Sequence, residues 1–235
     1  MRCWHDTPSL MICVTFSVLV AACGTSDTAA HVPVERPNVV LIMSDDQGWG
    51  ETGYNGHPQL KVPVLDEMAA TALRLDRFYA ASPVCTPTRA SVMTGRHANR
   101  SGAFAPNWST RPEETTIAHI LKAAGYRTGH FGKWHLGDNY PLRPQDQGFH
   151  EVLVHGGGGV GQTPDFFGND YFDDTYWHNG QTVKQKGYCT DVFFDAALRF
   201  IDGKSSNGGG DKPFFCYIPP NAAHGPFLVC LLYTS

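Results

Sequence analysis

The segment from Cys85 to Arg89 places a thiol and a guanidinium group four residues apart. Pro87 favours the first turn of a helix, Thr86 is predicted to cap that helix, and Gly95 is its predicted stop. A helix N-terminus favours the thiolate, and Arg89 lies on the same helix face and adds a positive charge. The spacing therefore indicates a reactive cysteine. It differs from the phosphate loop of cysteine phosphatases, which places the arginine farther from the cysteine and has glycines between them.

A second chemical feature is the pair Asp45-Asp46, which follows the apolar run from Pro37 to Met43. Such a run predicts a strand buried on both faces, and ligands of open α/β sheets bind at the carboxyl ends of strands. Two neighbouring carboxylates suit a hard cation. Taken alone, the pair is more typical of a solvated turn after a strand, so its interpretation depends on the Cys85 segment.

The elements that must hold these residues alternate between strand and helix. The apolar spacing predicts helices over residues 63–73, 116–124 and 190–202, strands over 37–43, 126–131 and 213–218, and a short strand or extended segment over 75–80. This order predicts a layered α/β fold with a mainly parallel sheet.

The stretch 136–186 has no clear periodicity, and loops of that length inside a domain usually carry function. Its glycine run, 156–159, lacks the pattern of a phosphate-binding loop and is predicted to be a flexible rim. His155, which directly precedes the run, is a candidate for the substrate rim.

The charge balance excludes one class of partner. The chain has 18 Lys and Arg against 22 Asp and Glu, a net charge of −4. It therefore has no general attraction for nucleic acid, and an anionic substrate must be held by a local cluster or a metal ion.

The first residues have the layout of an export signal. An apolar run over 10–22 follows Arg2 and is too short to span a bilayer comfortably. It ends Val20-Ala21-Ala22-Cys23, which resembles a bacterial lipobox, so 1–23 is predicted to be a signal peptide with Cys23 lipidated and 24–36 a polar tether. The alternative is ordinary cleavage near Ala22 or Ala30. Either interpretation predicts an exported protein, in the periplasm or as an outer-membrane lipoprotein.

Four cysteines remain in the body of the chain, too few for a disulfide scaffold. Cys189 and Cys216 are predicted to pack as small apolar residues or to pair with each other. Cys85 calls for a different explanation because of the residues around it.

The motifs together resemble the sulfatase family, whose most specific signature is Cys-x-Pro-x-Arg. The resemblance continues in the family's order through Arg36-Pro37-Asn38, Asp45-Asp46, Pro83 to Arg96, Gly132-Lys133-Trp134-His135-Leu136-Gly137 and His224-Gly225-Pro226. It implies an alkaline-phosphatase-like fold. Residues 37–228 would be the N-terminal part of the catalytic domain, and 229–235 an atypical tail.

The resemblance also implies roles for individual residues. A maturation enzyme would oxidise Cys85 to Cα-formylglycine, whose hydrate has one hydroxyl to attack sulfur and a second to release sulfate. Arg89 matches the residue that holds the formylglycine oxygen, and Lys133 and His135 match those that contact the sulfate and the nucleophile. His224 matches the histidine near the leaving-group oxygen.

Asp45, Asp46 and the modified residue 85 match ligands of a divalent cation, calcium rather than magnesium. The family's second half supplies an Asp-Asn pair and another lysine that have no counterpart here. The resemblance predicts hydrolysis of aryl or carbohydrate sulfate monoesters. Two alternatives stay open: a phosphonate or phosphate ester hydrolase on the same scaffold, and an inactive, truncated lipoprotein fragment that binds anions.

Overall fold

The computed structural model of the 235-residue chain describes residues 36–203 and 212–228. The predicted signal peptide with Cys23, the tether up to residue 35 and the tail over 229–235 lie outside the described residues. Within the part described, no helix has the length and apolar character needed to cross a membrane.

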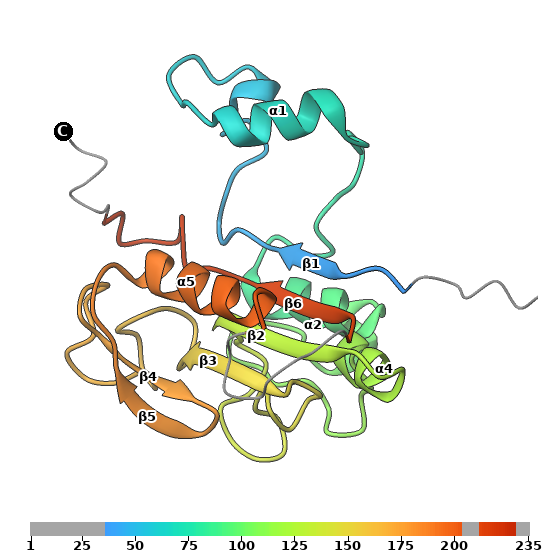
Figure 1. Cartoon of the computed structure of the whole chain (residues 1–235), viewed down its shortest axis with the longest axis vertical. Coiled ribbons are helices and arrows are strands. Elements are labelled where there is room, and N and C mark those ends of the chain that lie inside the picture. Colours follow the sequence, from blue (N-terminus) through green and yellow to red (C-terminus); the bar gives the residue numbers. More distant parts are fainter. Residues whose placement is uncertain (1–35, 204–211, 229–235) are drawn as a thin grey trace, which may run out of the picture. The chain divides into compact units, whose positions relative to one another are not determined.

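Six strands form one sheet in the order β1-β6-β2-β3-β4-β5 (Figure 1). The first four strands in this order are mutually parallel. β4 pairs antiparallel with β3 on one side and with β5 on the other. The strands are β1 (Val39–Ile42), β2 (Arg127–Lys133), β3 (Glu151–His155), β4 (Thr175–His178), β5 (Gln181–Lys184) and β6 (Phe214–Ile218). The predicted layered, mainly parallel α/β class is therefore confirmed.

Five α-helices and one 3-10 helix are present in the described residues. They are η1 (Gly53–Asn55), α1 (Pro63–Thr71), α2 (Cys85–Thr94), α3 (Ala98–Ser101), α4 (Ile117–Ala123) and α5 (Cys189–Ile201). Thr116 caps α4 by accepting from the His119 N–H. Gly95 ends α2 in the left-handed conformation at φ 65°, which glycine adopts without strain. The predicted stop at Gly95 is confirmed.

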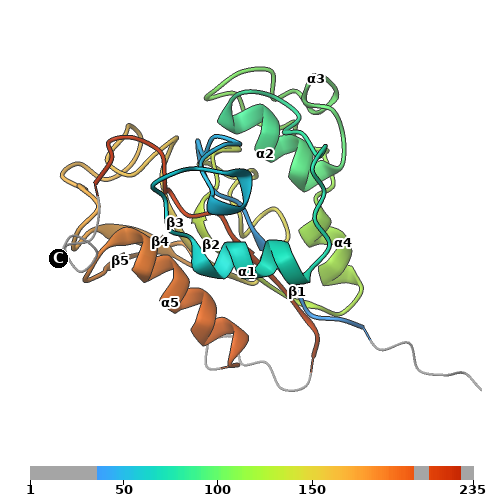
Figure 2. The ribbon, with the colours of Figure 1, turned by 90° about the horizontal axis from the view of Figure 1, so that it is seen from above.

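Helices cover both faces of the sheet, as Figure 2 shows for α5 on one side and α2 and α4 on the other. The apolar stripe of α5, which includes Phe193 and Phe200, packs in one core with Phe131 and Cys216. Residues of α2 and α4 form the second core with Phe149, Phe215 and Tyr217. Cys189 and Cys216 are buried free thiols, which confirms the apolar-packing alternative, and burial raises the pKa of each to about 12.

Three strands lie within the stretch for which the sequence predicted no regular structure. β4 and β5 are joined by Asn179-Gly180, whose φ values are 50° and 82°. Asn-Gly with both residues at positive φ is the typical two-residue hairpin turn. That dipeptide was a usable signal for the hairpin.

Two predictions for the N-terminal part of the fold are wrong. β1 is not buried on both faces: in the described chain it pairs only with β6, and Val40 and Ile42 alternate outward and are exposed. Residues 75–80 contain a turn, in which the Phe78 N–H donates to Leu75 O at 3.3 Å, and otherwise irregular backbone, so neither the strand nor the extended segment forms. Helix α1 forms as predicted, but it has no buried residues, and Leu65 and Met68 are exposed.

Candidate active site

The carboxyl ends of neighbouring parallel strands bring the predicted residues together. Asp45 follows β1, and its N–H donates to Ala222 O, beyond the end of β6, at 2.9 Å. Lys133 is the last residue of β2. Because parallel strands end at the same edge of a sheet, residues distant in sequence meet there.

Helix α2 presents Cys85 to this edge. Cys85 is the first residue of the helix, and Val84 occupies the N-cap position without a side-chain cap. The prediction that Thr86 caps the helix is wrong, because Thr86 lies inside the first turn and its hydroxyl is buried. The uncapped first turn leaves its N–H groups directed toward the side on which Cys85 lies.

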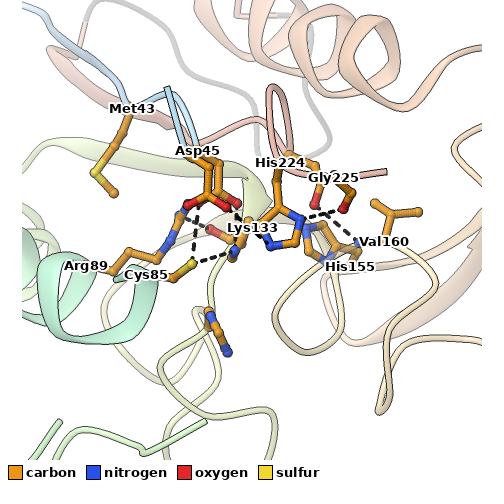
Figure 3. A network of polar contacts seen from close by, with 12 residues as sticks. Met43, Asp45, Cys85, Arg89, Lys133, His155, Val160, His224 and Gly225 are labelled. Carbon is orange, nitrogen blue, oxygen red and sulfur yellow. Dashed lines mark hydrogen bonds and ion pairs between the residues drawn. The ribbon is translucent and has the colours of Figure 1, made fainter. Parts of the chain in front are cut away.

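The charged groups of the site form a close buried cluster. Lys133 Nζ lies 2.6 Å from Asp45 Oδ2 and 3.3 Å from Cys85 Sγ. Arg89 Nη2 lies 3.3 Å from Asp45 Oδ1, and the Cys85 thiol points at the same oxygen from 3.7 Å. Figure 3 shows these side chains converging from β2, from α2 and from the segment after β1.

Two cations serve one carboxylate in this cluster. Burial opposes ionisation of Asp45, but the charges of Arg89 and Lys133 outweigh it and hold the pKa of Asp45 below its usual value. Arg89 and Lys133 are almost completely buried. The pair therefore forms a fixed positive environment beside Cys85, suited to an anionic ligand.

The two predicted histidines take different positions. His135 lies two residues beyond β2, and its Nε2 lies 2.9 Å from Asn107 Oδ1. Burial, followed by the charges of Lys133 and Arg89, lowers its pKa to about 3, so its ring is neutral. His224 lies beside Asp45 in Figure 3, and its Nε2 lies 3.7 Å from Asp46 Oδ2.

The residues present fit a cation in part. Ligand atoms of Asp45, Cys85 and His224 lie within 4.8 Å of one another. Asp46 adds a half-exposed carboxylate beside His224. Two carboxylates suit a hard cation, and an oxygen at position 85 would suit it better than the sulfur of Cys85.

One open cavity adjoins the cluster, and a second lies beside His135. One of about 590 Å³ is lined by Asp45, Asp46 and Cys85 together with apolar residues of the segment before α2. Another of about 260 Å³ is lined by His135 and Asn107. A ligand can therefore approach the buried cluster from solvent.

The glycine run and His155 do not form a flexible rim. Residues 156–159 are buried, and the N–H groups of Gly156 and Gly157 donate to carboxylates of Asp165 and Asp138 at 3.0 Å. Side chains would block this close backbone approach. His155 is also fully buried at the end of β3, which contradicts its prediction as a rim residue.

Asn107 was not among the residues selected from the sequence. It lies in an irregular segment, belongs to no motif and gives no periodic signal. Its positive φ of 64° is typical of Asn in loops, but only the structure shows that it contacts His135.

A family model described as Sulfatase matches residues 37–234. The chain belongs to the sulfatase family. An arylsulfatase of Hemicentrotus pulcherrimus is 35% identical over 212 residues, which cover 80% of this chain and 37% of that protein. An N-acetylgalactosamine-6-sulfatase of Mus musculus is 37% identical over 222 residues, covering 84% of this chain and 42% of that protein. This sulfatase chain thus spans less than half the length of these relatives.

Solved structures show the same fold. The crystal structure of Ps i-CgsB has a TM-score of 0.73 and 30% identity, covering 82% of this chain and 46% of that one. BT4656, solved in complex with D-glucosamine-2-N,6-O-disulfate, has a TM-score of 0.70 and 26% identity, covering 83% of this chain and 36% of that one. These matches agree with the alkaline-phosphatase-like architecture implied by the sulfatase motifs.

Proposed function

We propose that the protein hydrolyses sulfate monoesters, with residue 85 as the nucleophile after oxidation of Cys85 to formylglycine by a maturation enzyme. The observation that carries this is the position of Cys85 at the start of α2, 3.3 Å from Lys133 Nζ and facing Asp45. When formed, the hydrated aldehyde supplies the hydroxyl that attacks sulfur.

The fixed cations would bind and orient the substrate. Lys133 and Arg89 are buried beside residue 85, so they offset the negative charge of a sulfate group without rearranging. His135 would contact the sulfate or the nucleophile as a neutral imidazole. We assign the leaving-group oxygen to His224, because His224 lies beside Asp45 and Asp46 and is partly exposed.

We assign the cation site to Asp45 and Asp46 with an oxygen of modified residue 85. Calcium fits better than magnesium, because calcium accepts more oxygen ligands in less regular geometry. Its charge would offset the repulsion between the two carboxylates and a sulfate anion. Calcium affinity measured by isothermal titration should disappear in Asp45→Ala. Unchanged affinity would place the cation elsewhere.

The substrate class we favour is a carbohydrate sulfate, with aryl sulfates as synthetic substrates. Relatives of the chain include N-acetylgalactosamine-6-sulfatase, and BT4656 was solved with a disulfated glucosamine. The cavities beside Cys85 and His135 give access for a ligand larger than free sulfate.

We also propose that the protein is exported and anchored through a lipid on Cys23. The support is the lipobox-like sequence after an apolar run. Cell fractionation of wild type and Cys23→Ala tests this: the wild type should be in the membrane fraction and the variant should be soluble. Identical fractionation would contradict the anchor and leave the catalytic proposal untouched.

Mass spectrometry of the peptide from Ser82 to Arg89 tests the nucleophile. Protein made beside a maturation enzyme should show the aldehyde or its hydrate at position 85. Unmodified thiol throughout would overturn the formylglycine proposal. Rates on matched aryl sulfate and aryl phosphonate esters then test the reaction, and faster turnover of the phosphonate would replace sulfate by a phosphorus ester as substrate.

A further inference from the structure

Two residues with left-handed backbone meet beside the sulfate site. His135 has φ 58° and Asn107 has φ 64°, and their side chains are joined at 2.9 Å. Positive φ is uncommon outside glycine, although Asn and His adopt it more often than most residues, and functional sites are among the places where it occurs. The contact joins two such residues that are 28 positions apart in sequence.

The hydrogen bond defines which nitrogen of His135 holds the proton. The amide oxygen of Asn107 can only accept, so His135 Nε2 carries the hydrogen. The ring is neutral, because burial and then the charges of Lys133 and Arg89 lower its pKa to about 3. Nδ1 therefore holds a lone pair and no hydrogen.

This lone pair accepts no hydrogen bond from the described part of the chain. His135 Nδ1 is buried and has no hydrogen-bond partner there. A buried unpaired acceptor is unfavourable and calls for an explanation such as a ligand or a catalytic role. The ring follows Lys133, the last residue of β2, by two residues in the chain.

Gly158 limits the ring from another side. A Cβ on Gly158 would lie 2.9 Å from His135 Cε1 and 3.0 Å from His135 Nε2. The absence of a side chain at residue 158 is thus a condition for the ring to reach Asn107. This gives one glycine of the buried run a specific task.

We infer that Asn107 is a positioning residue that holds His135 as its Nε2–H tautomer, with Nδ1 presented as an acceptor for a hydroxyl hydrogen in the sulfate site. The inference deepens the proposed function and rests on it for the identity of that hydroxyl. The tautomer itself is a property of the folded chain, so it can be measured without turnover.

The direct test is a long-range ¹H–¹⁵N spectrum of protein labelled at histidine, with His135→Gln used to assign the His135 signals. Wild type should show the Nε2–H tautomer. Asn107→Gly should show a tautomer mixture, because the acceptor is gone, while Asn107→Asp should retain Nε2–H, because a carboxylate oxygen replaces the amide oxygen. An Nδ1–H ring in wild type, or an unchanged Nε2–H ring in Asn107→Gly, overturns the inference.

The glycine variant also separates positioning from backbone strain. Glycine adopts positive φ freely, so Asn107→Gly removes the side-chain contact with His135 without adding backbone strain at residue 107. Its kcat on an aryl sulfate should fall about 10- to 100-fold with little change in KM, as for other residues that orient a catalytic group, and Asn107→Asp should recover most of the loss. An unchanged kcat in Asn107→Gly contradicts the positioning role.

Gly158→Ala provides a second route to the same state without touching Asn107. The new methyl group should displace the His135 ring and disturb the Nε2–H tautomer. If wild type shows the expected tautomer but no sulfatase turnover, the proposed function fails while the hold of Asn107 on the tautomer stands. If turnover is present and the tautomer is wrong, only this inference fails.

Discussion

The buried charged cluster of Asp45, Cys85, Arg89 and Lys133, called the centre below, and helix α1 differ in what holds them in place. In the centre, Asp45 and Lys133 come from separate elements, are almost completely buried and each contact at least two other groups. Helix α1 has no buried residue, and its apolar Leu65 and Met68 face outward. Local sequence accounts for α1 through Pro63 at its start and Asp66 in its first turn.

This difference teaches where the structure is determined by tertiary contacts. Moving any member of the centre leaves a buried charge without its partner, so the positions are coupled. Changing a side chain of α1 removes few contacts. The predictions below test this contrast, and they run from the largest expected effect to the smallest.

Cys85→Ala should lower turnover of an aryl sulfate by more than about 10⁴-fold, the scale expected when a nucleophile is lost. Cys189→Ala is the matched control, since Cys189 is a buried free thiol that packs in the α5 core and has no proposed role in the reaction. Kinetics of both variants check the expectation. Similar loss in the two would show that the effect comes from folding.

Lys133→Met should lower the free energy of unfolding by about 3–5 kcal/mol, because it removes a buried partner of Asp45. Turnover should also fall, by about 10²- to 10³-fold, since a fixed cation beside the sulfate is lost. The exposed Lys184→Met on β5 is the control and should stay within about 0.5 kcal/mol. Denaturant unfolding measures both. Equal effects would show that the buried ion pair with Asp45 does not contribute.

Met93→Ala and Met68→Ala compare the same substitution on α2 and α1. Met93 is 1% exposed and Met68 is 56% exposed. We expect a loss of about 2–5 kcal/mol at Met93 from burial and cavity formation. At Met68 we expect a change within about 0.5 kcal/mol. Denaturant midpoints give the difference. A large loss at Met68 would mean that the apolar face of α1 is covered in the protein.

His130 tests the acid sensitivity of the core near the centre. Its ring packs against Trp134, Phe149 and Tyr217, and burial followed by the charge of Arg89 lowers its pKa to about 3. Below its unfolded pKa of 6.5 the unfolded chain binds a proton that the folded chain does not, so stability falls as pH falls toward 3.

His130→Phe removes this titrating group. The loss of unfolding free energy on acidification from about pH 6 to pH 4 should then become less steep, by up to about 1.4 kcal/mol per pH unit. Urea unfolding at several pH values measures the slope. An unchanged slope would show that His130 is not buried as a neutral ring.

Much of the fold could be predicted from periodicity and local signals. The strand–helix order, the stop of α2 at Gly95 and the stripe of α5 follow from spacings within one element. The edge position of β1 could not, because exposure of Val40 and Ile42 depends on which strands neighbour it. The Asn179-Gly180 dipeptide alone could have predicted the hairpin, but the aromatic and acidic residues around it give no clear strand periodicity.

The sequence by itself determined the candidate residues of this sulfatase-family chain. They are Cys85, Pro87 and Arg89 at one helix start, and Asp45, Lys133, His135 and His224 in motifs that resemble the family. Only the tertiary structure decided which atoms meet, namely Lys133 Nζ with both Asp45 and Cys85, and Asn107 with His135. The physical reason is that spacing along one helix or strand sets the direction of side chains. Distances across a sheet edge depend instead on strand order and loop path, which no local pattern contains.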